Sequence, residues 1–317
     1  MPTTGPDPRL ALISSLDLAS CRIEFSGHPV VLLCGGRVPP PKPTADDPDP
    51  PIGSMRHAIT SAWPEFRIFR PEEIKDWHTD GIFKDLVSFE LELAAICSLM
   101  VIVPESEGSL VELGAFSQLH ELSEKSIVIC SSQFARDASF INLGILRFLT
   151  ARNKTRVKTY PWEIKRPDSI SPELVGDVIS DIKNELEKLP GSQVLKTSQR
   201  AHASIVICEL LRFFVALKEN EIHEYLNLMG FELTKDDLRG KLFLLENFQL
   251  IKTQSYSDAV FYMSDETTHH KLRVAFQDKS KKFDALRIDV QCRDFYKNDQ
   301  RFRNWHRAIS QSTKVIP

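Results

Sequence analysis

The apolar run Leu99–Val103 constrains the fold more than any other stretch, because no polar residue interrupts it. Such a run is typical of a parallel strand that is buried on both faces of a sheet. Pro104 ends the strand, and the next five residues are expected to form a turn with a positive φ at Gly108, with Ser109 as a helix cap and with backbone N–H groups free to meet an anion. Glu112 is then expected in the first helical turn, where open α/β sheets bind ligands.

A second strand pattern covers Pro29–Cys34 and ends in the pair Gly35-Gly36. Because glycine has no Cβ, the backbone can approach a ligand closely there. An ordinary tight turn after a strand explains the pair equally well. Further strand patterns cover residues 67–70, 125–130 and 155–162, with helix patterns between the earlier ones. This alternation predicts an α/β fold with a Rossmann-like parallel sheet.

A proline-rich stretch separates the glycine pair from the next predicted helix, over residues 55–66. Seven prolines and three aspartates lie between Val38 and Pro51. This composition excludes a helix or strand interior and favours an extended, solvated loop. We interpret it as an insertion at the mouth of the site.

The length of 317 residues leaves room for two domains. A helix that begins at Ser171 ends at Pro190–Ser192, a turn-rich junction. Three short amphipathic helices and a strand pair follow, in the order of a winged helix. We therefore expect an N-terminal segment (1–27), an α/β domain (28–192), a winged-helix-like α+β domain (193–265) and a basic C-terminal segment (266–317).

The net charge of −3 gives no overall attraction to nucleic acid, so such binding requires a local patch. From Thr267 onward the chain has twelve Lys/Arg against five Asp/Glu, and Phe295, Tyr296, Phe302 and Trp305 lie between these charges. The pattern fits nucleic-acid binding with base stacking; a terminal helix packed by its aromatic residues is the alternative. The candidate nucleic-acid-binding residues are Lys281, Lys282, Arg301 and Arg303.

The predicted third helix of the winged helix carries acidic and basic residues together, among them Asp236, Asp237, Arg239 and Lys241. A mixed face makes protein docking as plausible as DNA binding. The six cysteines are scattered and are expected to be reduced core residues. No eighteen-residue apolar segment, N-terminal signal or metal-ligand cluster is present, which favours a cytoplasmic protein without a metal.

The polar groups at three predicted strand ends are expected to converge on one crevice: Gly35 and Gly36; Ser106, Gly108, Ser109 and Glu112; and Asn142. A single carboxylate beside backbone that can bind phosphate suits attack on, or stabilisation of, an oxocarbenium-like anomeric carbon. Equally well, Glu112 could have only a structural role, as an acidic residue in the first helical turn that interacts favourably with the helix dipole.

Several motifs carry a resemblance to a known family. In order along the chain, they are Leu33–Gly36, Phe69–Glu73, Ser88–Glu90, Val103–Ser117 and Ser139–Gly144. Together they resemble the nucleoside 2-deoxyribosyltransferase-like effectors of bacterial retron antiphage systems. The resemblance covers residues 28–150, and the second half of the chain is similar only in arrangement.

The resemblance implies a toxic N-glycosidase that depletes a nucleotide such as NAD, which would be its substrate, with no separate cofactor. It also implies an effector that is held inactive by a reverse transcriptase with its msDNA and non-coding RNA, and that can form a homo-oligomer or filament. Glu112 falls on the catalytic glutamate of the family, and Glu90 matches a second acid. The implied substrate-binding residues are Cys34, Gly35, Gly36, Pro104, Ser106, Gly108, Ser109 and Asn142.

Two departures from the family pattern affect the site. The proline-rich loop is longer than in related effectors, and Ser98 stands where many members have an aspartate that contacts the sugar hydroxyls. The alternative function is a non-catalytic nucleotide sensor whose winged helix acts as an adaptor or a DNA-binding regulator.

Overall fold

The computed structural model describes residues 6–26, 29–40, 42, 44, 46–63, 67–74, 81–136, 138–265 and 270–312. Parts of the predicted proline-rich loop (residues 41, 43 and 45), of the helix over residues 55–66 (residues 64–66) and of the basic segment (residues 266–269 and 313–317) lie outside these ranges. The chain divides into two compact units. Unit 1 contains residues 1–27, 76–92 and 190–317, and unit 2 contains residues 28–75 and 93–189.

Unit 2 is built on a five-stranded sheet in which every neighbouring pair is parallel. Its strands, in spatial order, are β3 (Arg67–Phe69), β2 (Val30–Cys34), β4 (Leu99–Ile102), β5 (Ser126–Ser131) and β6 (Val157–Tyr160). The two apolar runs that the sequence marks as buried strands are β2 and β4, and every residue of both is buried. Buried neighbours on both faces explain why neither run alternates with polar residues.

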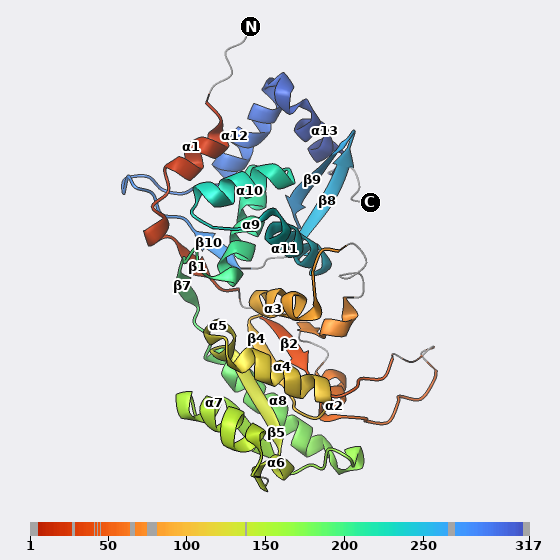
Figure 1. Ribbon diagram of the computed structural model, residues 1–317. Helices are drawn as coiled ribbons and strands as arrows, with labels where there is room; N and C mark the ends of the chain where they lie inside the picture. The colour runs from red at the N-terminus through yellow and green to blue at the C-terminus, as the bar shows by residue number, and fades with distance from the viewer. Residues whose placement is uncertain are drawn as a thin grey trace. The chain divides into compact units, whose positions relative to one another are not determined.

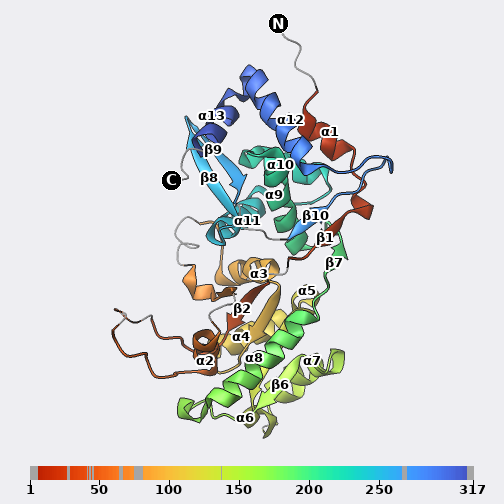
Figure 2. The same ribbon diagram turned by 180° about the vertical axis from the view of Figure 1, so that it is seen from behind.

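Helices cover both faces of this sheet. On one face, α2 (Met55–Ala62) and α8 (Pro172–Glu187) pack against β2, β4 and β5 through a single apolar cluster that includes Trp63, Trp162 and Val178. The opposite face carries α4 (Glu107–Ser117), which lies in front of the sheet in Figure 1, whereas α8 lies in front of it in Figure 2. The described part of the unit also contains six shorter helical segments: η2 (Pro71–Glu73), α5 (His120–Ser123), α6 (Ser132–Arg136), the π-helical η4 (Ile141–Leu146), α7 (Arg147–Arg152) and η5 (Pro167–Ser169).

The strand order identifies where a ligand site belongs in unit 2. From β2 the chain passes to β3 on one side of the sheet, and the next strands, β4, β5 and β6, are added on the other side. The carboxyl ends of β2 and β4 therefore flank the point where the strand order reverses. In open α/β sheets this switch point is the usual ligand crevice.

Unit 1 combines a small sheet, a helical core and a hairpin. Antiparallel pairing joins β10 (Lys271–Arg273), β1 (Arg22–Glu24) and β7 (Ser192–Val194). The helices of the core are α1 (Pro8–Ser14), α9 (Arg200–Phe214), α10 (Glu219–Leu228), α11 (Lys235–Asn247), α12 (Ala285–Asn298) and α13 (Arg303–Ser312). After α11 comes the hairpin of β8 (Ile251–Tyr256) and β9 (Ala259–Ser264), and Leu217 bridges to Tyr262 beside it. The remaining long helix, α3 (Leu86–Ile96), has residues in both units.

The unit boundaries differ from the four segments expected from the sequence. Residues 6–26 and 81–92 are not separate pieces but parts of unit 1. The reason at the N-terminus is Arg9, whose buried guanidinium pairs with Glu221 of α10 at 2.6 Å and lies 4.7 Å from the ring centre of Phe302. A short terminal segment is thereby fixed into the core.

The C-terminal aromatic residues pack inside the same core, and this corrects the expectation that they stack on bases. Tyr296 and Trp305 are buried, and Phe302 packs against Phe295. The Tyr296 hydroxyl donates to the backbone carbonyl of Phe214 at 2.8 Å. The alternative, terminal helices packed by their own aromatic residues, is therefore correct. In the part of the chain that the structure describes, no helix is both long and apolar enough to cross a bilayer.

Candidate active site

A group of charged side chains lies at the switch point of unit 2. We call it the crevice cluster and define it as Arg56, Glu72, Glu105 and Glu112, with the thiol of Cys34 beside Glu112. Cys34 ends β2, Arg56 lies in the first turn of α2, Glu72 in η2, Glu105 just after β4 and Glu112 on α4. Five separate segments thus supply groups to one place.

Arg56 is the centre of this cluster. Its side chain is buried, and Nη2 donates to Oε2 of Glu72 at 2.8 Å, while Nη1 lies 3.4 Å from the carbonyl oxygen of Gly36. The buried Nε has no hydrogen-bond partner in the described chain. A buried guanidinium with one unused donor is costly in a purely structural role, and it points to a ligand or water that supplies the missing acceptor.

The Glu105 carboxylate accepts hydrogen bonds from three backbone N–H groups that could otherwise bind an anion. They are the N–H groups of Met55 and Arg56, both at 2.9 Å, and of Gly36 at 3.1 Å. The first two belong to the opening turn of α2, where N–H groups lack helical acceptors. Burial raises the pKa of Glu105, although these hydrogen bonds and Arg56 act in the opposite direction. Glu105 lies three residues after β4, in the stretch assigned to the turn, and it was not predicted to be a site residue.

Glu112 lies in the second turn of α4, not in the first, because the helix begins at Glu107. Burial raises the pKa of its carboxyl, whereas Arg56 and a hydrogen bond from the Cys34 thiol lower it, and Glu72 raises it. Cys34 thus contacts the Glu112 side chain, and its predicted contact with the substrate stays a prediction. A partly desolvated carboxylate beside an arginine at a switch point has the position and charge of a reacting group.

The turn before α4 is capped differently from the prediction. Ser106, not Ser109, is the N-cap: its hydroxyl accepts the N–H of Ser109, and the Ser109 hydroxyl accepts the N–H groups of Glu105 and Ser106. Gly108 is the second residue of the helix and does not have a positive φ. Several N–H groups expected to be free for an anion are therefore used internally. Pro104 is buried directly before this turn.

The glycine pair after β2 is required by protein packing. A Cβ on Gly35 would lie 2.8 Å from Cβ of Arg56, and a Cβ on Gly36 would lie 2.8 Å from Cβ of Ser54 and 2.9 Å from Cγ of Glu105. Neither distance is tolerable for real side chains. The close approach that we assigned to a ligand is thus made by α2 and Glu105.

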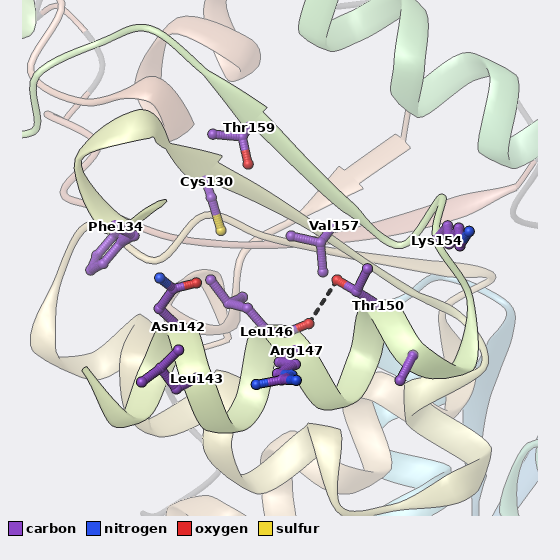
Figure 3. A pocket seen from close by; sticks show the side chains of 11 residues that line it. Cys130, Phe134, Asn142, Leu143, Leu146, Arg147, Thr150, Lys154, Val157 and Thr159 are labelled. Carbon is purple, nitrogen blue, oxygen red and sulfur yellow. Dashed lines mark hydrogen bonds between the residues drawn. The ribbon is translucent and has the colours of Figure 1, made fainter. Parts of the chain in front are cut away.

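The structure describes Asn142 at a pocket beside η4, and its contact with the substrate stays a prediction. This residue is in η4 and lines the pocket with Cys130, Phe134 and other residues of β5, β6 and α7 (Figure 3). No member of the crevice cluster lines that pocket. Glu90, the expected second acid, belongs to unit 1, so its participation stays a prediction.

Unit 1 changes the interpretation of the candidate DNA-binding helix. Lys241 of α11 is buried, and its Nζ pairs with Glu92 at 2.5 Å; Arg200 also pairs with Glu92. A Cβ on the neighbouring Gly240 would lie 3.0 Å from the ring of Phe83. Segment 81–92 therefore covers this part of α11, which is unavailable to a DNA groove.

Of the four cations assigned to nucleic-acid binding, Arg301 is committed to the protein, because its guanidinium pairs with the buried Asp299 at 2.6 Å. Lys281, Lys282 and Arg303 are exposed and form no side-chain hydrogen bond or ion pair within the described residues. These three retain a charge that a phosphate can use. Likewise, the described part of the chain holds no group of three or more His, Cys, Asp or Glu side chains suited to a metal ion.

Fold and site together define an α/β protein with a five-stranded parallel sheet and an arginine–glutamate cluster at its switch point. The chain belongs to the STM3845 retron effector protein family, whose pattern it matches over residues 53–253. The matched range includes Arg56, Glu72, Glu105 and Glu112. This chain is therefore a retron effector.

Two curated relatives from Escherichia coli are similar to parts of it. "Retron Ec86 putative ribosyltransferase/DNA-binding protein" is 34% identical over 131 residues, which cover 40% of this chain and 39% of that protein. "Retron Ec73 putative ribosyltransferase/DNA-binding protein" is 27% identical over 184 residues, which cover 49% of this chain and 57% of that protein. The chain thus spans less than two thirds of the length of either relative.

Proposed function

We propose that this retron effector is a nucleoside deoxyribosyltransferase-like N-glycosidase that hydrolyses NAD or a related nucleotide, with Glu112 as the catalytic carboxylate. The observation that carries the proposal is the place of Glu112. It lies partly buried on α4, at the carboxyl ends of β2 and β4, and its carboxyl receives a hydrogen bond from Cys34. The ribosyltransferase names of the two relatives are consistent with chemistry at C1′ of a ribose.

The proposed reaction needs little more than this carboxylate. As the C1′–N bond of NAD breaks, its electron pair moves to the pyridinium nitrogen, and nicotinamide leaves as a neutral molecule without being protonated. The Glu112 carboxylate stabilises the positive charge at C1′ or bonds to it, and water then adds to C1′ and releases a proton. A purine would normally require a general acid on the base, and the described groups around Glu112 offer no evident one.

For the diphosphate, two places were expected, the Gly35-Gly36 backbone and the turn at Ser106–Ser109, and the second is better supported. The N–H of Gly36 is occupied by Glu105, whereas Glu107 and Gly108 are the first residues of α4, where N–H groups lack helical acceptors. A Cβ on Gly108 would meet no atom within 4 Å, so the space beside it is open. We assign the diphosphate to this helix start.

Unit 1 is proposed to be the part that responds to the retron. Its order of three helices and a hairpin is that of a winged helix, although segment 81–92 covers α11 at Gly240 and Lys241. We propose that the reverse transcriptase and its msDNA hold the effector inactive, with Lys281, Lys282 and Arg303 near the nucleic-acid backbone. The second candidate, a DNA-binding regulator without catalysis, is favoured by the DNA-binding part of the relatives' names, but a covered Lys241 argues against reading DNA with α11.

A comparison of two substrates tests the proposed chemistry. Purified protein is incubated separately with NAD and with deoxyadenosine, and free nicotinamide and adenine are followed over time. We expect nicotinamide release to be the faster reaction. Equal or faster release of adenine would return the enzyme to nucleoside chemistry with a general acid, and release of neither base would favour the non-catalytic alternative.

A further inference from the structure

The pocket that contains Asn142 is large enough to bind a ligand of its own. Its volume is about 560 Å³, within the usual range of roughly 300–1,000 Å³ for small-molecule sites. One wall is the sheet, through Cys130 of β5 and Val157 of β6, and the other is the helical segment η4–α7. Because the crevice cluster contributes no residue to it, an inference about this pocket does not rest on the proposed reaction.

The helical wall has an unusual geometry. Residues Ile141–Leu146 form a π-helix, which continues directly into α7 at Arg147. Wide π turns are rare, and they occur frequently at functional sites. Here the turn brings Asn142, Leu143 and Leu146 onto the pocket. The π turn thus forms part of the wall of this second site.

The lining combines an apolar middle with unused positive charge. In Figure 3, Phe134 and Asn142 lie at one end of the pocket and Lys154 at the other, with Leu146 and Val157 between them. Arg147 projects from the same helical wall, at the rim. Neither the Arg147 side chain nor the Lys154 side chain forms a hydrogen bond or ion pair within the described residues, and both are exposed.

This distribution selects a chemical class. The apolar middle favours a flat or compact organic body, because burying it removes apolar surface from water. Two unpaired cations favour one anionic group, and charge-assisted hydrogen bonds to phosphate are among the strong ones. Cys130 gives no covalent chemistry, since burial raises the pKa of its thiol to about 12.

We propose that this pocket is a second, non-catalytic binding site for an elongated organic anion, a ring system with one phosphate group, of which the phosphate lies between Arg147 and Lys154. The ring lies along Leu146 and Val157, toward Phe134. AMP has this shape and charge and is a suitable probe. Adenosine supplies only the ring system, and inorganic phosphate supplies only the anionic group.

Calorimetric titration of the full chain with AMP, adenosine and inorganic phosphate tests the proposal. We expect AMP to bind about tenfold or more tightly than either fragment, because only AMP uses both the apolar wall and the cations. In the variant Arg147→Ala/Lys154→Ala we expect AMP affinity to fall about tenfold or more. Lys165→Ala is the matched control, since Lys165 is an exposed lysine of unit 2 that does not line the pocket.

Two further variants separate this pocket from the crevice cluster. Ala151→Trp places a large side chain at the pocket lining and should weaken AMP binding with little change in melting temperature, because Ala151 is exposed. Glu112→Gln should leave the AMP affinity of the pocket unchanged. Failure of AMP to bind overturns the proposal, as does a double variant that binds AMP like the control. Loss of AMP binding in Glu112→Gln alone would also overturn it, by assigning the nucleotide to the crevice cluster.

Discussion

Arg56 pairs with Glu72 at 2.8 Å and forms no ion pair with Glu112, although its charge acts on all three carboxylates of the crevice cluster. Among the described residues, no cation forms an ion pair with the catalytic candidate. Arg56, a buried residue that pairs with Glu72, favours the ionised form of Glu112.

The pH profile of the reaction should report this arrangement. Burial raises the pKa of Glu112 above its ordinary value of 4.5. Because the carboxylate acts only when it is ionised, we expect kcat/KM to fall with decreasing pH, with its midpoint above 4.5. A midpoint at or below that value would contradict the assignment of Glu112.

Two substitutions should move this midpoint in opposite directions. Arg56→Met removes the positive charge that favours ionised Glu112, so the midpoint should move to higher pH. Glu72→Gln removes a negative charge that disfavours ionisation, so it should move to lower pH. The other polar neighbour, Cys34, is retained in both variants. Shifts of the same sign, with melting curves that show both variants folded, would be inconsistent with electrostatic control by this pair.

Glu105 should matter for stability. Glu105→Gln replaces a carboxylate that accepts three backbone N–H groups with an amide that has one acceptor oxygen and two donors. We expect a loss of about 2 kcal/mol in the free energy of unfolding, measured by urea titration. The control is Glu107→Gln, the same exchange at an exposed residue of α4, for which we expect a change of about 0.5 kcal/mol or less. Equal stability of the two variants would show that the Glu105 contacts contribute nothing.

The exposed cations of the C-terminal segment should set the salt dependence of nucleic-acid binding. The variant Lys281→Ala/Lys282→Ala/Arg303→Ala should bind an RNA–DNA hybrid more weakly, and the slope of log affinity against log salt should become shallower by about 0.9 for each phosphate contact that is lost. Arg301 is left in place because Asp299 would otherwise be buried without its partner. Fluorescence anisotropy over a salt series measures the slope. A slope equal to that of Lys165→Ala would exclude these residues from the interface.

The sequence was most informative where one local property decides the structure. Continuous apolar runs identified β2 and β4, because burial on both faces removes the need for polar alternation. Ser171, followed by proline and an acid, correctly marked the start of α8. At α4 two serines were able to cap the helix, and the choice of Ser109 moved the expected start of the helix by three residues.

The parts of the site that were missed depend on contacts between distant segments. Arg56 and Glu72 lie 16 residues apart, and Glu105 lies 49 residues beyond Arg56. Only the parallel pairing of β2 with both β3 and β4 brings their segments together. The π-helix that carries Asn142 was not predicted, because nothing in the local pattern distinguishes a π-helix from other short segments. Asn142 lines a pocket to which the crevice cluster contributes no residue.

The most direct test of the account compares NAD hydrolysis by the unmodified chain, Glu112→Gln and Glu187→Gln, with nicotinamide release as the readout and thermal melting as the check on folding. Both exchanges remove one carboxylate charge from a helix of unit 2, but Glu187 is an exposed residue of α8 outside the crevice cluster and outside the proposed diphosphate site. We predict that Glu112→Gln stays folded and loses about a thousandfold or more of the hydrolysis rate, whereas Glu187→Gln keeps most of it. A folded Glu112→Gln variant that hydrolyses NAD as fast as the unmodified chain would contradict the central claim.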